Sequence, residues 1–203
     1  LSVLAFVISK CDLARAANVA PSFKKGANQT ALENSGAKTV AKWATLIGAG
    51  PVSEKSQTLT FEVSNDNNSI FSVQPAISST GILTFTTAGA NVHGMATVTV
   101  VLSDNGGTTG GGDDTSDAQT FTITVLAVND APAFTQGADQ TVLEDSGPRT
   151  VSGWATGMSA GPSDESSQTW TFILTHTNKA LFSTQPSLSP TGVLTFTPAT
   201  NAF

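Results

Sequence analysis

The feature that most constrains this chain is an internal repeat that runs without a gap. When the sequence is shifted so that Asn18 falls on Asn129, the segment that begins at Asn18 aligns with the segment that ends at Phe203. Identical residues occupy 39 of the 75 aligned positions. A fixed period of this kind is typical of a tandem array of one structural unit. We therefore expect two copies of one fold, at 18–128 and 129–203, the second lacking its last two strands in this chain.

Short stretches of the first copy alternate between apolar and polar residues. The clearest lie at 57–64, 81–86, 97–102 and 120–128. A period of two places one set of side chains in a core and the other in water, as in a half-buried strand. The copy of the first stretch, at 168–175, predicts a strand as well. Gly, Pro, Asn and Ser clusters separate the stretches, and together they predict an all-β chain of tandem antiparallel β-sandwiches.

Charge and composition narrow the classes of function. The formal net charge is −6 with only nine Lys and Arg. We expect no nucleic-acid partner, because binding phosphates needs clustered basic residues. No run of 18 apolar residues occurs, so no membrane span is expected. The single cysteine, Cys11, cannot form an internal disulfide, so stability must come from core packing with or without metal ions.

The segment at 1–17 does not belong to the repeat. An apolar stretch, Leu1–Ser9, is followed by charged residues and by the triplet Ala-Arg-Ala at 14–16. This leader is open to three interpretations: the remnant of a secretory signal, an extra edge strand or a disordered leader. A fourth hypothesis is that the apolar stretch completes the truncated copy of a neighbouring chain by β-strand addition, which would make the chain a filament subunit.

Several short motifs carry a family resemblance. They are LENSG or LEDSG, WAT, GP-x-x-E, QP-x-x-S-x-TG-x-L-T-F and LSDNGG, and the segment VNDAPAF at 128–134 resembles the linker between cadherin repeats. As a set they make residues 18–203 similar to the bacterial immunoglobulin-like/cadherin-like tandem repeats of large secreted surface proteins and adhesins. The resemblance implies an extracellular, cell-surface protein whose stacked sandwiches act as a stiff spacer in adhesion. The implied partners are neighbouring repeats or copies and cell-surface or glycan ligands.

The resemblance also implies structural calcium at the repeat junctions. It implies that Glu33 and Glu144 are base glutamates near the first strand of each copy, and that Asn129 and Asp130 are linker ligands. It also implies a strand-end aspartate at Asp104 and an acidic loop at Asp164 and Glu165, with Glu54 as the first-copy counterpart of Glu165. Oxygen-only donors suit calcium, which takes 6–8 oxygens, whereas zinc favours Cys and His. Because Val19 stands where an acid follows Asn129, we expect the better site at Asn129 and an empty one at Asn18.

Residues with catalytic potential do not form a recognisable pattern. His93 and His176 lie at non-equivalent places in the repeat, and no Gly-x-Ser-x-Gly elbow occurs. We therefore expect the chain not to be an enzyme. Trp43 and Trp154 recur, and we expect them to pack in cores and not to form a sugar-stacking platform. The alternative function is an accessory carbohydrate-binding module of a secreted enzyme.

Overall fold

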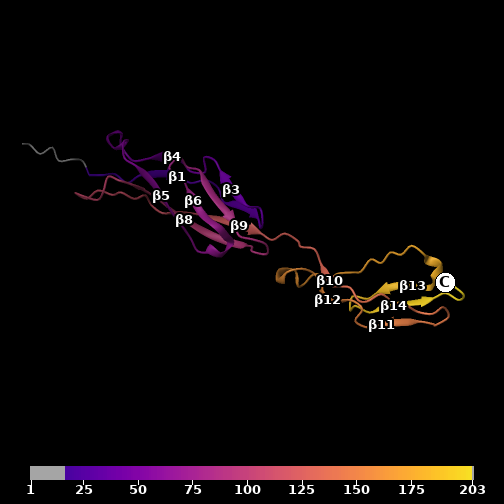
Figure 1. Ribbon diagram of the computed structural model, residues 1–203. Coiled ribbons are helices and arrows are strands. Elements are labelled where there is room, and N and C mark those ends of the chain that lie inside the picture. Colours follow the sequence, from indigo (N-terminus) through magenta and orange to yellow (C-terminus); the bar gives the residue numbers. More distant parts are fainter. Residues whose placement is uncertain (1–16, 203) are drawn as a thin grey trace, which may run out of the picture. The chain divides into compact units, whose positions relative to one another are not determined.

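The computed structural model describes residues 17–202, which divide into two compact units (Figure 1). Unit 1 ends at Ala127 and unit 2 begins at Val128. The regular structure of both consists of strands, nearly all of them paired antiparallel, and short 3₁₀ turns, so the all-β prediction is confirmed. Residues 1–16 of the leader, with Cys11 and the hypothetical donated strand at 1–9, lie outside the described residues.

Across the described residues, the structure contains no helix with the length and apolar character needed to cross a membrane.

From residue 17 onward, unit 1 contains nine strands and two 3₁₀ turns. They are β1 (Ser22–Lys24), β2 (Gln29–Leu32), β3 (Ala37–Val40), β4 (Thr45–Gly48), η1 (Val52–Glu54), β5 (Leu59–Asn65), η2 (Asn68–Ile70), β6 (Phe71–Ile77), β7 (Leu83–Thr87), β8 (Gly94–Asp104) and β9 (Gln119–Leu126). The four stretches that alternate in the sequence fall on β5, β7, β8 and β9, as predicted.

The strands of unit 1 form two main sheets and a ribbon. One sheet has the order β2-β9-β8-β5, the second has the order β3-β7-β6, and β1 pairs with β4. Every pairing of these strands is antiparallel except that of β2 with β9, which is parallel and aligns Ala31 with Val125. This parallel pair joins the two strands of the large sheet that come first and last along the chain.

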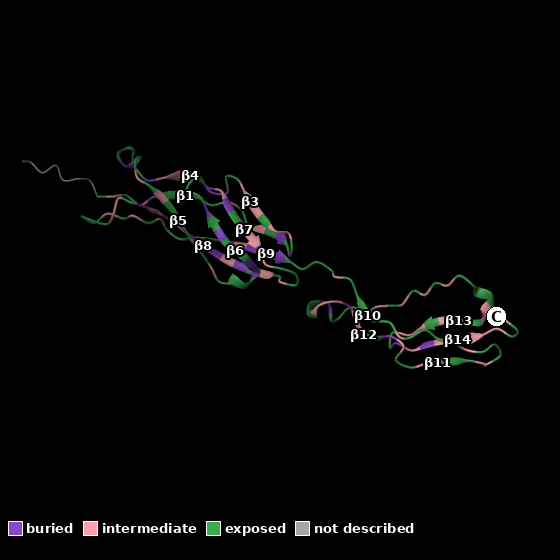
Figure 2. Cartoon of the chain, viewed as in Figure 1, coloured by how far each residue is buried: buried purple, intermediate pink, exposed green. Residues whose placement is uncertain are grey.

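The core of unit 1 takes its side chains from both main sheets. Val98, Val100 and Leu102 alternate along β8 and are fully buried, and Leu83 and Phe85 of β7 are buried in the same cluster. Trp43 is also part of this core, as predicted, with its ring 4.3 Å from that of Phe121. Buried residues are correspondingly concentrated along these strands in Figure 2.

The elements of unit 2 keep the offset of the sequence repeat from their counterparts in unit 1, except that β11 begins one position later. They are β10 (Ala133–Thr135), β11 (Arg149–Val151), β12 (Thr156–Ser159), η3 (Ser163–Glu165), η4 (Lys179–Leu181), β13 (Phe182–Leu188) and β14 (Leu194–Pro198). They form the sheet β11-β14-β13 and the ribbon β10-β12, the counterparts of β3-β7-β6 and β1-β4.

The prediction of a strand at 168–175 is wrong. This segment is the copy of β5, but the structure shows no strand there. In unit 1 β5 pairs with β8 along its whole length, from Leu59 opposite Asp104 to Asn65 opposite Val98. The sequence holds no second copy of β8, so the segment has nothing to pair with. The copy of β2, at 140–143, is not a strand for the same reason, because β2 pairs with β9.

Candidate functional site

A buried glutamate fastens the start of each unit to a 3₁₀ turn. In unit 1 the carboxylate of Glu54, in η1, accepts the backbone N–H of Val19 at 3.3 and 3.4 Å. In unit 2 Glu165 Oε1, in η3, accepts the backbone N–H of Asp130 at 2.6 Å. Both glutamates are nearly inaccessible to solvent. The recurring glutamate therefore positions the first residues of each unit.

The glycine of the GP-x-x-E motif makes room for this glutamate. A Cβ on Gly50 would overlap Glu54 Oε2, and one on Gly161 would overlap Glu165 Oε2. Gly50 also has a φ of +130°, a conformation that other residues rarely adopt. The motif thus encodes a turn in which a buried carboxylate packs against a glycine, where any side chain would block it.

Asn18 lies at the centre of a polar cluster at the same end of unit 1. Its Nδ2 donates to Asp104 Oδ1 at 2.8 Å and to the carbonyl oxygen of Asp113 at 2.7 Å. Its Oδ1 accepts from Gln57 Nε2 at 2.7 Å. Asp104, the last residue of β8, also accepts the backbone N–H of Gly106 at 2.8 Å and is buried. The cluster ties the chain entry to the end of β8.

The amide of Gln57 lies against the Asp104 carboxylate and can donate to it in only one of its two orientations. Its second terminal atom lies 3.3 Å from both carboxylate oxygens, and exchanging the amide oxygen and nitrogen by a flip would let the nitrogen donate to them. Beside it lies a polar hollow of about 490 Å³, lined by Asn18, Ser53, Glu54, Gln57, Gly106 and Thr109. The donor set around this hollow is made of oxygens and amides.

Unit 2 has a similar polar cluster made of fewer residues. Asn129 Oδ1 accepts from Gln168 Nε2 at 3.0 Å, as Asn18 accepts from Gln57. Glu165 Oε2 is buried and has no hydrogen-bond partner. No residue of this sequence stands at the copy of Asp104. The structure therefore gathers more polar groups around Asn18 than around Asn129, whereas the sequence led us to favour the Asn129 end.

The glutamate Glu33 lies at the opposite end of unit 1 from Asp104. In the register of β8 and β9, Gly94 faces Val125 and the pairing ends at Val100, so Asp104 is at the far end of β8. Glu33 follows β2, is buried, and its N–H donates to the carbonyl oxygen of Leu126 at 2.9 Å. The structure thus does not bring Glu33 and Asp104 together.

Of the remaining predicted ligands, all in unit 2, three lie close together. Asp130 and Glu165 meet through the hydrogen bond described above, with Asn129 next to them. Glu144 and Asp164 are exposed. Sequence reasoning missed Gln57 and Gln168 as members of the cluster. The signal was present, because the tripeptide Ser-Gln-Thr recurs at 56–58 and 167–169.

Acidic and metal-ligating residues are sparse around each of these positions. Over residues 17–202, no three His, Cys, Asp or Glu side chains are grouped so that they could hold a metal ion on their own. A cation at the Asn18 cluster would therefore need amide and backbone oxygens alongside the carboxylates. No protein-family model matches the chain, and no curated protein matches it.

Replacing Asp104 by Ala should loosen the loop that follows β8. The change removes the acceptor of the Gly106 N–H and one of the two acceptors of the Asn18 amide nitrogen, which costs about 1–3 kcal/mol for such part-buried groups. Hydrogen exchange followed by mass spectrometry should show faster exchange in 102–116. Asp117→Ala, at an exposed position, is the matched control. Equal exchange in the two variants would show that Asp104 does not hold the loop.

Proposed function

We propose that the chain is a non-catalytic segment of an extracellular surface protein, in which the units act as stiff spacers in adhesion. The proposal follows the resemblance to bacterial immunoglobulin-like/cadherin-like tandem repeats. It is supported by the elements that the two units share, which recur at one offset, and by Glu54 and Glu165, which anchor the start of each unit in the same way. The burial of Trp43 in the core supports a spacer over a sugar-binding platform.

The observation that carries the proposal is the parallel pairing of β2 with β9. In a tandem array, tension enters unit 1 from its N-terminal side and leaves after Leu126. It pulls β2 back from Gln29 and β9 forward from Leu126, along the strand axis in opposite directions. The parallel ladder runs from Gln29 beside Ile123 to Leu32 beside Leu126. All of its hydrogen bonds are then loaded together, and this arrangement resists extension better than bonds that open one after another.

Pulling unit 1 through its two ends should therefore meet a resistance that depends on this ladder. Ala31→Pro removes a backbone donor from β2, and we expect the unfolding force of unit 1 in single-molecule stretching to fall well below that of the unmodified chain. Phe85→Leu is the control, because Phe85 lies on β7 and its change weakens the core while leaving the backbone of β2 and β9 unaltered. An equal fall in force for both variants would show that the ladder carries no special load, and would remove the spacer proposal.

We propose further that calcium binds weakly at the N-terminal end of each unit. In unit 1 the supporting donors are the carboxylates of Asp104 and Glu54 and the amide oxygens of Asn18 and Gln57. Gln57 suits the site both with and without an ion. Without an ion its amide nitrogen can donate to Asp104, and with an ion its amide oxygen can turn toward the cation. In unit 2 the corresponding groups are Asn129, Asp130, Glu165 and Gln168. A bound ion would neutralise these carboxylates and stiffen the entry to the unit.

Removing calcium should lower the melting temperature of the chain. Extracellular modules bind calcium with a Kd of about 10⁻⁴–10⁻³ M. At ten- to a hundredfold excess, one site adds about 1.4–2.7 kcal/mol, or about 5–20 °C for a unit of this size. Circular dichroism melts with calcium and with a chelator measure the shift. Asp104→Asn should reduce it and Asp117→Asn should not. Identical melts with and without calcium would exclude the calcium site and leave the spacer proposal standing.

A further inference from the structure

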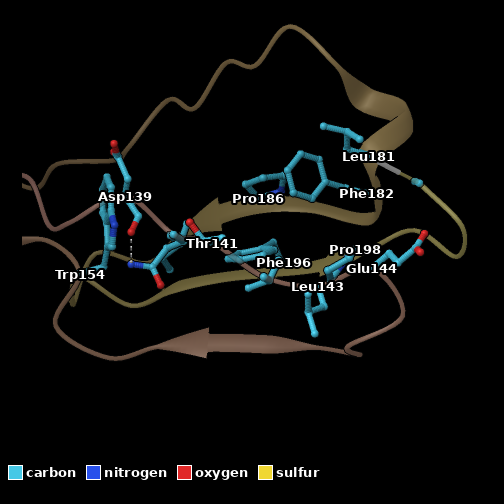
Figure 3. Close-up of a pocket in the computed structure, with 14 residues that line it drawn as sticks. Asp139, Thr141, Leu143, Glu144, Trp154, Leu181, Phe182, Pro186, Phe196 and Pro198 are labelled. Atoms are coloured by element: carbon cyan, nitrogen blue, oxygen red, sulfur yellow. Dashed lines mark hydrogen bonds between the residues drawn. The ribbon is translucent and has the colours of Figure 1, made fainter.

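Unit 2 presents an open apolar surface with two hollows. The larger, about 500 Å³, is lined among others by Leu143, Trp154, Phe182, Leu194 and Phe196 (Figure 3). The smaller, about 350 Å³, is lined among others by Phe134, Trp154, Trp170, Phe172 and Leu188. Trp154 lines both hollows, so they form one continuous surface. We call it the open face of unit 2.

Unit 1 shows what covers the same residues when the sheet is complete. Trp43, the counterpart of Trp154, packs on Phe121 of β9 and is only 3% exposed. Phe23, the counterpart of Phe134, is 8% exposed, whereas Phe134 is 50% exposed. The cover consists of the inward side chains of β8 and β9, namely Ala96, Val98, Val100, Leu102, Phe121, Ile123 and Val125.

The open face already has the geometry of its covered counterpart. The rings of Phe134 and Phe172 lie 5.1 Å apart at 85°, and those of Phe23 and Phe61 lie 5.1 Å apart at 87°. Phe182 and Phe196 lie 5.8 Å apart, close to the 5.9 Å of Phe71 and Phe85 in unit 1. A surface that needs little rearrangement binds with a smaller entropic cost.

Backbone on both sides of the open face is also available for pairing. The segments 140–143 and 170–176 are the copies of β2 and β5, and neither is a strand in unit 2. In unit 1 these two strands pair with β9 and β8, which lie between them. A two-stranded ribbon inserted in the same way would gain a hydrogen-bonded neighbour on each edge.

We propose that the open face of unit 2 binds a two-stranded antiparallel β-ribbon with the side-chain pattern of β8 and β9. One face of the ribbon carries Ala, Val, Leu, Ile and Phe against Trp154 and Phe172, and the other carries Thr and Ser toward water. The ribbon orders 140–143 and 170–176 into strands and completes a four-stranded sheet. Its first strand ends in an acid, as β8 ends in Asp104, and this acid meets Asn129. Binding needs neither calcium nor load.

A peptide with the sequence of residues 92–128 is the probe, titrated into the full chain. We expect saturable one-to-one binding by calorimetry. Hydrogen exchange should slow in 140–143 and 170–176, where strands form on binding. Exchange in 94–126 of the chain itself should stay unchanged, because unit 1 already holds these strands. Loss of protection there would mean that the peptide exchanges into unit 1, and would overturn the proposal.

Two modified peptides separate the two faces of the ribbon. Val98→Lys with Val100→Lys changes the inward face, whereas Thr97→Lys with Thr99→Lys adds the same charges on the partly exposed face. The inward pair should weaken binding at least about 100-fold, because burying each Lys costs more than the ~1.4 kcal/mol that equals a factor of ten. The outward pair should bind within a few-fold of the original. Equal affinities would refute an inward apolar face.

Two variants of the chain test the receiving surface. Phe172→Asp places a charge on the open face and should abolish binding. Leu46→Asp is its control, because Leu46 is 79% exposed and lies in unit 1, outside the open face. If the chain instead self-associates in sedimentation and the peptide does not compete, a second copy covers the face. If a glycan array gives ligands that Phe172→Asp loses, the face is a sugar site. Either result overturns the ribbon.

Discussion

Replacing Trp43 by Ala should destabilise unit 1 by about 3–5 kcal/mol. The indole is 3% exposed, packs against the ring of Phe121 at 4.3 Å, and donates from Nε1 to the carbonyl oxygen of Ala27 at 3.0 Å. The substitution opens a cavity between the two main sheets, and the rigid strands around it cannot collapse into the space. A loss of this size is a large part of the stability of a domain of about 110 residues.

The corresponding change in unit 2 should cost much less. Trp154 makes the same hydrogen bond, from Nε1 to the carbonyl oxygen of Ala138 at 2.9 Å, but it is only partly buried on the open face. Hydrogen exchange can measure both losses in one chain, because it reports each unit separately where a single unfolding curve would mix them. An equal loss for Trp43→Ala and Trp154→Ala would show that β9 does not contribute to holding Trp43.

The second large effect is expected for Gly81→Ala, at about 2–5 kcal/mol, the sum of two costs. Gly81 has a φ of +82°, and an added Cβ would overlap the backbone carbonyl oxygen of Ala44. The left-handed conformation costs a side chain about 1–2 kcal/mol, and relieving the overlap costs about 1–3 kcal/mol more. Ala44 also donates its N–H to the Gly81 carbonyl at 3.0 Å, so a shift would break this bond.

Gly36→Ala is the matched control for this prediction. Gly36 has a similar φ of +69°, but an added Cβ would meet no atom within 4 Å. It should therefore lose only the conformational part, about 1–2 kcal/mol. Hydrogen exchange in unit 1 of the two variants gives the comparison. If Gly36→Ala and Gly81→Ala were equally unstable, backbone conformation alone would explain both, and the close approach to Ala44 would have no energetic role.

Much of the fold could be predicted from the period-two pattern and the repeat. Thr and Val alternate strongly at 97–102, and β8 lies there because a strand with this pattern packs its Val side chains into the core and turns its Thr side chains toward water. The Trp prediction was right for Trp43, which is buried in the core, and wrong for Trp154, which is only half-buried because no copy of β9 covers it. Of the candidate site, the recurrence of Glu54 and Glu165 was visible, but their role as acceptors for Val19 and Asp130 was not.

The amino-acid pattern alone established the all-β class and the constant offset that relates Asn18 to Asn129, because side-chain periodicity and repetition are local properties of the chain. Tertiary structure decided which of these segments became strands. Residues 59–65 form β5 and their copy does not, although both alternate, because a strand exists only when a neighbour accepts its hydrogen bonds. It also decided the polar cluster, since Asn18, Gln57 and Asp104 meet only after β8 is in place.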